Sequence, residues 1–240
     1  MRLDKFFTTV GLLSRRECAI ACRRGEITVN GLPAKRADMP INEETDTVTL
    51  RGEAVEYRRF VYLFLNKPRG YVSATEDSRL PCVTELVPKE YGGRALFPCG
   101  RLDKDTEGLL LLTDDGALTH ALLSPKRGVE KIYRFTCEVP LCEEAEGRLA
   151  EGMTLGNGEA CRPAYLTAEE GRLAGRVTLT EGKYHEVKRM MAALGSPLSS
   201  LTRIAFAGIP LDEALAPGEC RRATEEEIKI LRNAAGKQGE

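Results

Sequence analysis

The chain has 240 residues, of which 42% are hydrophobic and 30% are charged, and its formal net charge is −1. This composition is typical of a soluble globular protein with one large domain or two smaller ones, and it argues against nucleic-acid binding through overall charge. No apolar run approaches the length of a membrane span, and residues 1–5 lack the apolar region of a signal peptide, so we expect a cytoplasmic protein.

The eight cysteines are scattered along the chain without a CxxC pair, and the chain has only two histidines. Without a secretion signal we expect reduced thiols that mostly pack in a core. Cys18 and Cys22 would share one helix face, which core packing explains more simply than half of a zinc site. We therefore expect no structural metal site.

The first sixty residues predict a compact α/β unit. An apolar stretch with helical spacing ends at Gly11, and Ser14 with Glu17 forms a capping-box pattern that opens a second helix. Strand-like segments follow at 27–29 and 46–50, and the first of them runs into an Asn-Gly turn signal.

Basic side chains concentrate in this unit. Residues 1–36 hold eight basic and three acidic side chains, whereas residues 37–56 hold six acidic and one basic. Exposed helical cations are often merely solvated, but one basic face is also what a phosphate-binding surface on RNA requires. The candidate RNA-binding residues here are Arg15, Arg16, Arg23, Arg24 and Lys35.

A second domain is expected beyond a polar joint near residues 53–59. Strand-like segments (109–113, 131–139, 172–180, 201–206) alternate there with helix-like ones (116–123, 143–151, 184–194). We predict an α+β fold in which a small α/β domain at 1–58 precedes a mixed, largely antiparallel sheet with flanking helices at 59–233. Residues 234–240 are expected to be a flexible tail.

The most specific motif is GRLDKDTEGLLLLTDDG at 100–116, where an acidic loop runs into four leucines. Asp103, Asp105 and Glu107 imitate the ligand spacing of an EF-hand calcium loop. An EF-hand needs a helix on each side, however, and the glycines before this loop and the leucines after it favour a loop that enters a buried strand. We do not expect calcium binding.

Three weaker clusters accompany this loop: NKPRGY at 66–71, KIYRF at 131–135 and EGKYHEVKRM at 181–190. The first could be an ordinary basic turn. In the second, Tyr133 could simply pack in a strand, although a tyrosine between two cations also suits stacking on a nucleobase. The third leads from a strand into a helix. Its His185 is interpreted as structural, since no triad partner is evident.

These four clusters, in this order behind the basic unit, resemble the RsuA-type pseudouridine synthases, and the basic unit looks like an S4 RNA-binding domain. The resemblance covers about the whole chain. MRLDKF at the start and LAPGE followed by TEEEI near the end also resemble the branch that acts on small-subunit ribosomal RNA. The resemblance implies a cytoplasmic, bacterial isomerase that needs no cofactor and no metal. We expect it to be a monomer.

Position by position, the resemblance makes Asp103 the catalytic carboxylate, Tyr133 the residue that stacks on the target base, and Lys188 the cation that pairs with the aspartate. Arg101 would hold the flipped nucleotide or orient the loop, and Arg189 could share the role of Lys188. It implies no catalytic role for Asp105 or Glu107. The RNA-binding residues expected outside the first domain are Lys67, Arg69, Arg101 and Arg189.

The implied reaction converts a uridine of 16S ribosomal RNA, free or in a small-subunit assembly particle, to pseudouridine. A single ionised carboxylate would act as nucleophile at C1′ or as base at C2′ after the target base has flipped out. One alternative is a synthase for 23S ribosomal RNA. Another is a non-catalytic S4-type RNA-binding or ribosome-assembly factor, in which Asp103, Tyr133 and Lys188 would not need to converge.

Overall fold

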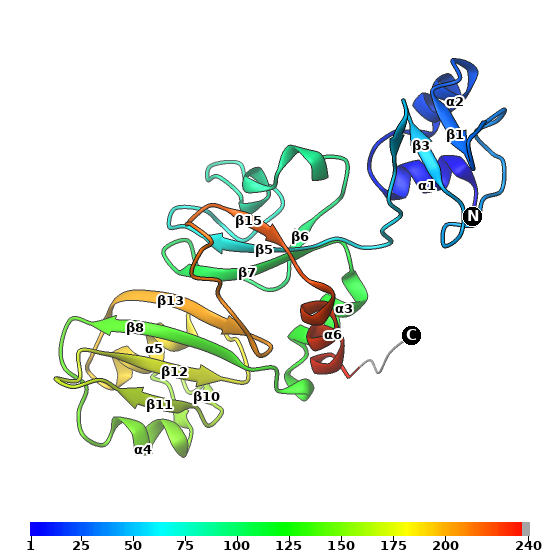
Figure 1. The fold of residues 1–240 in the computed structure, drawn as a ribbon. Coiled ribbons are helices and arrows are strands. Elements are labelled where there is room, and N and C mark those ends of the chain that lie inside the picture. Colours follow the sequence, from blue (N-terminus) through cyan, green and yellow to red (C-terminus); the bar gives the residue numbers. More distant parts are fainter. Residues whose placement is uncertain (237–240) are drawn as a thin grey trace. The chain divides into compact units, whose positions relative to one another are not determined.

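A computed structural model describes residues 1–236, so residues 237–240 of the expected tail lie outside the described part. The chain forms two compact units (Figure 1). The first comprises Met1–Val61 together with Val87–Leu96, and the second comprises Tyr62–Leu86 and the described residues from Phe97 onward. The sequence-based boundary near residue 58 did not include segment 87–96 in the first unit. This segment belongs to the first unit, although the residues before and after it in the chain belong to the second.

The first unit combines two α-helices with a small antiparallel sheet of order β2-β1-β3-β4. Its elements are α1 (Leu3–Thr9), α2 (Arg15–Arg23), β1 (Ile27–Val29), β2 (Leu32–Pro33), β3 (Val48–Leu50), β4 (Glu53–Ala54) and the 3-10 helix η2 (Lys89–Tyr91). The predicted capping box is present, since Ser14 accepts from the backbone N–H of Glu17 and Glu17 accepts from that of Ser14. The second helix therefore begins where the local sequence predicts, whereas the first ends at Thr9, two residues before Gly11.

Segment 87–96 meets the first unit at a pair of glycines. A Cβ atom on Gly93 would lie 1.8 Å from the backbone oxygen of Gly11, and one on Gly11 would lie 2.8 Å from the backbone carbon of Gly93. Only residues without a side chain permit this approach. The core of the unit is apolar, and Phe6 and Phe7 lie within it as a T-shaped pair.

The second unit is built on a nine-stranded mixed sheet. Its strands are β5 (Tyr62–Lys67), β6 (Phe97–Pro98), β7 (Glu107–Thr113), β8 (Lys131–Cys137), β11 (Tyr165–Ala168), β12 (Ala174–Leu179), β13 (Leu198–Phe206), β14 (Ile209–Pro210) and β15 (Cys220–Arg222). A separate hairpin is formed by β9 (Met153–Thr154) and β10 (Ala160–Cys161). The helices are α3 (Gly116–Leu123), α4 (Ala145–Ala150), α5 (Glu186–Ala193), α6 (Glu225–Ala234) and the 3-10 helices η1 (Val83–Leu86) and η3 (Pro125–Arg127).

The main path of the sheet has the order β11-β12-β8-β13-β7-β5-β15, and a parallel contact divides it into two halves. All its other neighbours pair antiparallel, whereas β13 and β7 are parallel and share only the pairs Thr202↔Glu107 and Arg203↔Gly108. A Cβ on Gly108 would lie 2.3 Å from the backbone oxygen of Arg203, so a glycine is needed at this seam. We call the β13–β7 contact the seam below.

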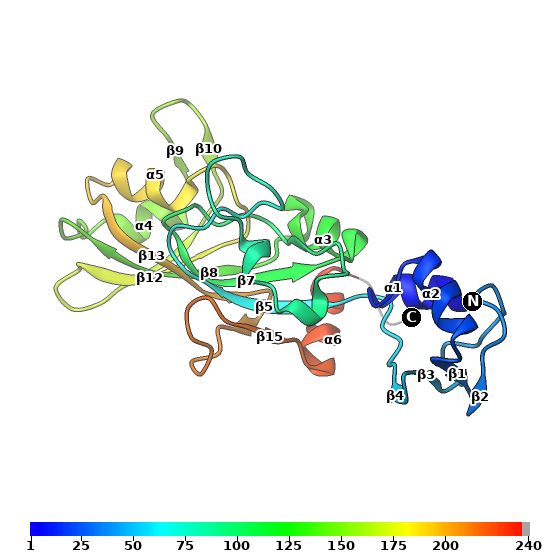
Figure 2. The ribbon, with the colours of Figure 1, turned by 90° about the horizontal axis from the view of Figure 1, so that it is seen from above.

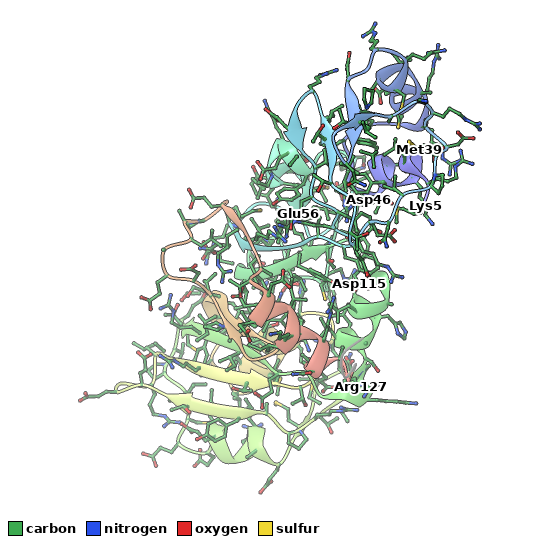
Figure 3. All side chains as sticks on the ribbon, turned by 45° about the vertical axis from the view of Figure 1, so that its right-hand side comes forward. Lys5, Met39, Asp46, Glu56, Asp115 and Arg127 are labelled. Carbon is green, nitrogen blue, oxygen red and sulfur yellow. The ribbon has the colours of Figure 1, made fainter. Side chains whose placement is uncertain are left out.

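The helices flank this sheet. Helices α5 and α6 lie on opposite faces of it (Figures 1 and 2). Asp115, labelled at the start of α3 in Figure 3, caps that helix by accepting from the N–H of Leu118, and it also accepts from the hydroxyl of Tyr62 at 2.9 Å. No helix within residues 1–236 combines the length and the apolar character that a transmembrane span requires.

The predicted α+β fold with a mixed, largely antiparallel sheet is confirmed. The four leucines of the acidic-loop motif form part of β7 and are fully buried, which rules out an EF-hand arrangement with helices on both sides. All eight cysteines are free thiols, and all but Cys142 and Cys220 are buried, as expected for packing residues.

Candidate active site

Asp103 lies in the loop that precedes β7, and hydrogen bonds with residues that follow β5 hold this loop in place. Ser73 donates its hydroxyl to the carbonyl of Leu102 at 2.9 Å and accepts from the N–H of the same residue at 3.0 Å. The N–H of Gly70 donates to the carbonyl of Lys104 at 2.8 Å. The backbone on each side of Asp103 is thus held by the turn that follows β5, so the carboxylate projects from a rigid support.

Lys67 completes this support, and its position corrects the expectation that it binds RNA. The side chain is fully buried, and its ammonium donates to the carbonyls of Thr106 at 2.8 Å and Pro68 at 3.0 Å. Burial lowers the pKa of Lys67 to about 8, although the nearby carboxylates of the loop oppose this shift. A buried ammonium that is used by backbone carbonyls cannot reach a phosphate, so Lys67 is a scaffold residue.

Lys188 lies on α5, which precedes β13 in the chain, and its side chain contacts the acidic loop that contains Asp103. Its ammonium lies 3.0 Å from Oδ2 of Asp103 and 2.5 Å from Oδ1 of Asp105. Burial opposes the charge of Lys188, but the hydrogen bonds with Asp105 and Asp103 outweigh burial and raise its pKa. The hydrogen bond with Lys188 in turn lowers the pKa of Asp105. Sequence reasoning missed that Asp105 shares this cation.

His185, which the sequence analysis interpreted as structural, lies directly beside Asp103. Its Nε2 atom is 3.4 Å from Oδ1 of Asp103, so both carboxylate oxygens have a nitrogen neighbour. The imidazole ring is stacked on the ring of Tyr184, with ring centroids 3.9 Å apart and an interplanar angle of 16°. Spacing along the sequence gave no signal for this contact, because 82 positions separate the two residues in the chain.

A cavity of about 810 Å³ brings the three predicted catalytic residues together. Asp103, Tyr133 and Lys188 all line it. Tyr133 lies on β8, where the alternating burial of the strand turns Lys131, Tyr133 and Phe135 to the inner face, as the sequence predicts. This convergence is what a catalytic protein requires and what a purely RNA-binding factor would not need.

Two further cations, which the sequence analysis did not assign to the site, lie deep in the same cavity lining. Arg203 is only 2% exposed and donates from Nε to the carbonyl of Leu109 at 2.7 Å. Lys131 is buried and donates to the carbonyl of Val129 at 3.0 Å, and burial lowers its pKa. These basic groups share the cavity lining with the carboxyl groups of Glu181 and Glu186.

Among the described residues, one group has the geometry of a possible metal site: Cys161, Glu181 and Glu186, whose ligand atoms lie within 4.8 Å of one another. Glu181 is already engaged, since it accepts from the N–H of Arg162 at 2.7 Å and pairs with Lys183 at 3.3 Å. Burial and the hydrogen bond with Glu181 raise the pKa of Glu186 to about 7. Two buried carboxyl groups that share a proton explain this group without a metal ion.

The remaining predicted RNA-binding residues lie in different surroundings. Arg101 is exposed and lines the cavity, whereas Arg69 is exposed outside it and lies 3.4 Å from Glu107. Arg189 is turned away from the cavity lining and forms an ion pair with Glu159 at 2.7 Å. The five predicted RNA-binding residues of the first unit are all exposed: Arg15, Arg16, Arg23, Arg24 and Lys35.

Comparison with known proteins matches residues 61–193 to the family described as RNA pseudouridylate synthase. An uncharacterized RNA pseudouridine synthase of Bacillus subtilis is 44% identical over 234 residues, which cover 96% of this chain and 98% of that protein. The ribosomal small subunit pseudouridine synthase A of Escherichia coli is 38% identical over 229 residues, or 95% of this chain and 98% of the relative. A solved pseudouridylate synthase structure, 36% identical, aligns with a TM-score of 0.67 over 96% of this chain and 99% of that one.

Proposed function

The chain belongs to the RNA pseudouridine synthase family, and from this premise we propose that it isomerises a specific uridine of small-subunit ribosomal RNA, with Asp103 as the catalytic carboxylate. The relatives named as small-subunit synthases, which match nearly their whole length, support this choice of RNA. The observation that carries the catalytic assignment is the contact of Asp103 with Lys188 inside the cavity that Tyr133 also lines.

The chemistry needs one carboxylate. Pseudouridine forms when the N1–C1′ bond of uridine breaks, the uracil turns, and a C5–C1′ bond forms, while the proton on C5 is lost and N1 gains one. Asp103 can attack C1′, or it can remove the proton from C2′, and the ammonium of Lys188 lies 3.0 Å from its Oδ2 atom as a partner of opposite charge. The walls of the cavity that Asp103 lines would hold the detached uracil next to the sugar.

The target base must leave its stack before Asp103 can reach the sugar. Flipping a nucleotide out costs on the order of a few kcal/mol, and stacking on an aromatic ring returns roughly 1–3 kcal/mol. Tyr133 supplies that ring from β8, and Arg101 at the exposed part of the lining supplies a cation for the phosphate of the flipped nucleotide. The buried Lys131 and Arg203 add positive potential where the detached uracil would carry negative charge.

We assign RNA docking to the first unit, as an S4-like domain. Its support is the exposed arginine-rich helix α2, which carries Arg15, Arg16 and Arg23, with Arg24 directly after it. Each phosphate contact that is removed should lower the slope of log affinity against log salt concentration by about one. Replacing these four arginines by alanine should therefore weaken RNA binding and flatten its salt dependence. Unchanged affinity and slope would refute the docking role.

The test of the proposed function uses ribosomal RNA that carries tritium at C5 of its uridines, because pseudouridine formation releases that tritium to water. The protein should release tritium from a small-subunit RNA transcript and not from a large-subunit transcript. Asp103→Asn should remove this activity, whereas Asp105→Asn, which deletes the other carboxylate on Lys188, should lower it by less than about tenfold.

Two outcomes would contradict the proposal. Full activity of a folded Asp103→Asn variant would refute the catalytic role of Asp103. Release from the large-subunit transcript alone would refute the choice of RNA, and mapping of pseudouridines in both ribosomal RNAs of a deletion strain would then identify the missing one.

A further inference from the structure

Each oxygen of the Asp103 carboxylate has a nitrogen neighbour from the first turn of α5 or its N-cap residue. Lys188 contacts Oδ2 at 3.0 Å, and His185 Nε2 lies 3.4 Å from Oδ1. Rotation about the last torsion of an aspartate is soft, because its preferences are broad and roughly two-fold. A single contact with Lys188 leaves that rotation free. A second contact on the other oxygen fixes the plane of the carboxylate.

The backbone at His185 is shaped for this contact. His185 is the N-cap residue of α5, and it adopts a left-handed conformation with φ 49° and ψ 35°. Such a conformation is uncommon for a residue other than glycine, and conformations of this kind persist where the surrounding structure over-determines them, often at functional sites. The N–H of Lys183 donates to Oε2 of Glu186 at 2.9 Å and closes the turn around His185.

The ring of His185 is also held in plane. Tyr184 stacks on it at a centroid distance of 3.9 Å, although Tyr184 itself is 71% exposed and lies at the cavity. Stacking restricts rotation of the imidazole ring, so that Nε2 stays directed toward Asp103. Neutral imidazole donates from one ring nitrogen, and protonated imidazole donates from both, so Nε2 can offer an N–H to Asp103 in either charge state.

Resting on the proposed function, we propose that His185 is a positioning residue, which together with Lys188 fixes the Asp103 carboxylate in the orientation that meets the sugar. The carboxylate is then oriented before RNA arrives. A reacting group that is displaced by about 1 Å can lose about 100-fold in rate. His185 therefore acts on the rate of the chemical step through Asp103, and it contributes little to the affinity for RNA.

Two substitutions separate the N–H group from the ring. His185→Phe keeps a flat ring that can stack on Tyr184 but offers no hydrogen-bond donor, whereas His185→Gln keeps an N–H donor without the ring. Tritium release from the small-subunit RNA transcript gives kcat and KM. We expect kcat of His185→Phe to fall between about 10-fold and 100-fold, with KM changed less than about threefold. His185→Gln should recover most of the lost rate.

A surface tyrosine provides the matched control for the stacking partner. Tyr184→Leu should lower kcat by a few-fold, since it releases the ring of His185, whereas Tyr165→Leu, at a tyrosine of equal exposure on β11 outside the cavity, should not. Both positions are exposed, so neither change threatens the fold.

Wild-type kcat in His185→Phe, or equal losses in His185→Phe and His185→Gln with Tyr184→Leu unaffected, would overturn the positioning role. Failure of the wild-type protein to release tritium would instead refute the proposed function.

Discussion

Replacement of Glu186 by glutamine tests whether two buried carboxyl groups of the cavity lining, Glu181 and Glu186, share a proton. Glu186 is 4% exposed, and burial, followed by its hydrogen bond with Glu181, raises its pKa from 4.5 to about 7. Between these two values the unfolded chain has released this proton while the folded protein retains it. The unfolded state therefore binds fewer protons, and the free energy of unfolding falls as the pH rises through this window. The full effect is about 3 kcal/mol, because each pKa unit corresponds to about 1.4 kcal/mol.

Glutamine resembles the protonated form of Glu186 and does not titrate. We expect Glu186→Gln and the wild type to have similar free energies of unfolding below about pH 4, where Glu186 is protonated in both the folded and the unfolded chain. By about pH 8 the variant should be the more stable by up to about 3 kcal/mol. Urea unfolding followed by far-UV circular dichroism at several pH values measures this difference, and Glu226→Gln, at a side chain that is 79% exposed, is the control. A difference between Glu186→Gln and wild type that does not change from pH 5 to 8 would refute the shared proton.

Three further predictions concern the site and its support. Lys67→Met should leave the carbonyl of Thr106 unpaired and destabilise the protein by about 2–4 kcal/mol in urea unfolding, and an unchanged midpoint would contradict the scaffold role. Tyr133→Phe should retain most of the tritium release, whereas Tyr133→Leu should lose it, because stacking needs the ring. Equal loss in both variants would show that the hydroxyl rather than the ring is required. Lys188→Met should lower kcat about 100-fold, because Asp103 loses its cation, whereas Lys188→Arg should retain part of the wild-type kcat. Equal kcat in the wild type and both variants would refute the pairing.

The sequence predicted best those features that neighbouring residues determine. The capping box at Ser14 sets the start of α2, because the side chains that satisfy the free N–H groups lie within three positions. The leucine run predicted β7, and the alternation around Tyr133 predicted which side of β8 is buried. The order of the four clusters led to the family resemblance, and that resemblance predicted the convergence of Asp103 and Lys188.

Features that depend on contacts between distant segments could not be predicted. The sequence around Lys67 predicts a surface cation, since nothing in NKPRG indicates that its ammonium is buried against the carbonyl of Thr106. His185 had no visible partner, because the fold alone brings it to Asp103. The return of segment 87–96 to the first unit depends on the approach of Gly11 and Gly93, which a pattern of local turns does not reveal.

The seam in the sheet has a consequence for how activity is acquired during folding. Asp103 leads into β7 in one half of the sheet, whereas Tyr133 lies on β8 and Lys188 precedes β13 in the other half. At the seam the strands of the two halves pair in parallel at two positions. Neither half alone contains both Asp103 and Lys188. Under the proposed function, activity toward RNA therefore requires the long-range docking of β13 on β7, and a chain with only one half folded would lack the paired acid and cation.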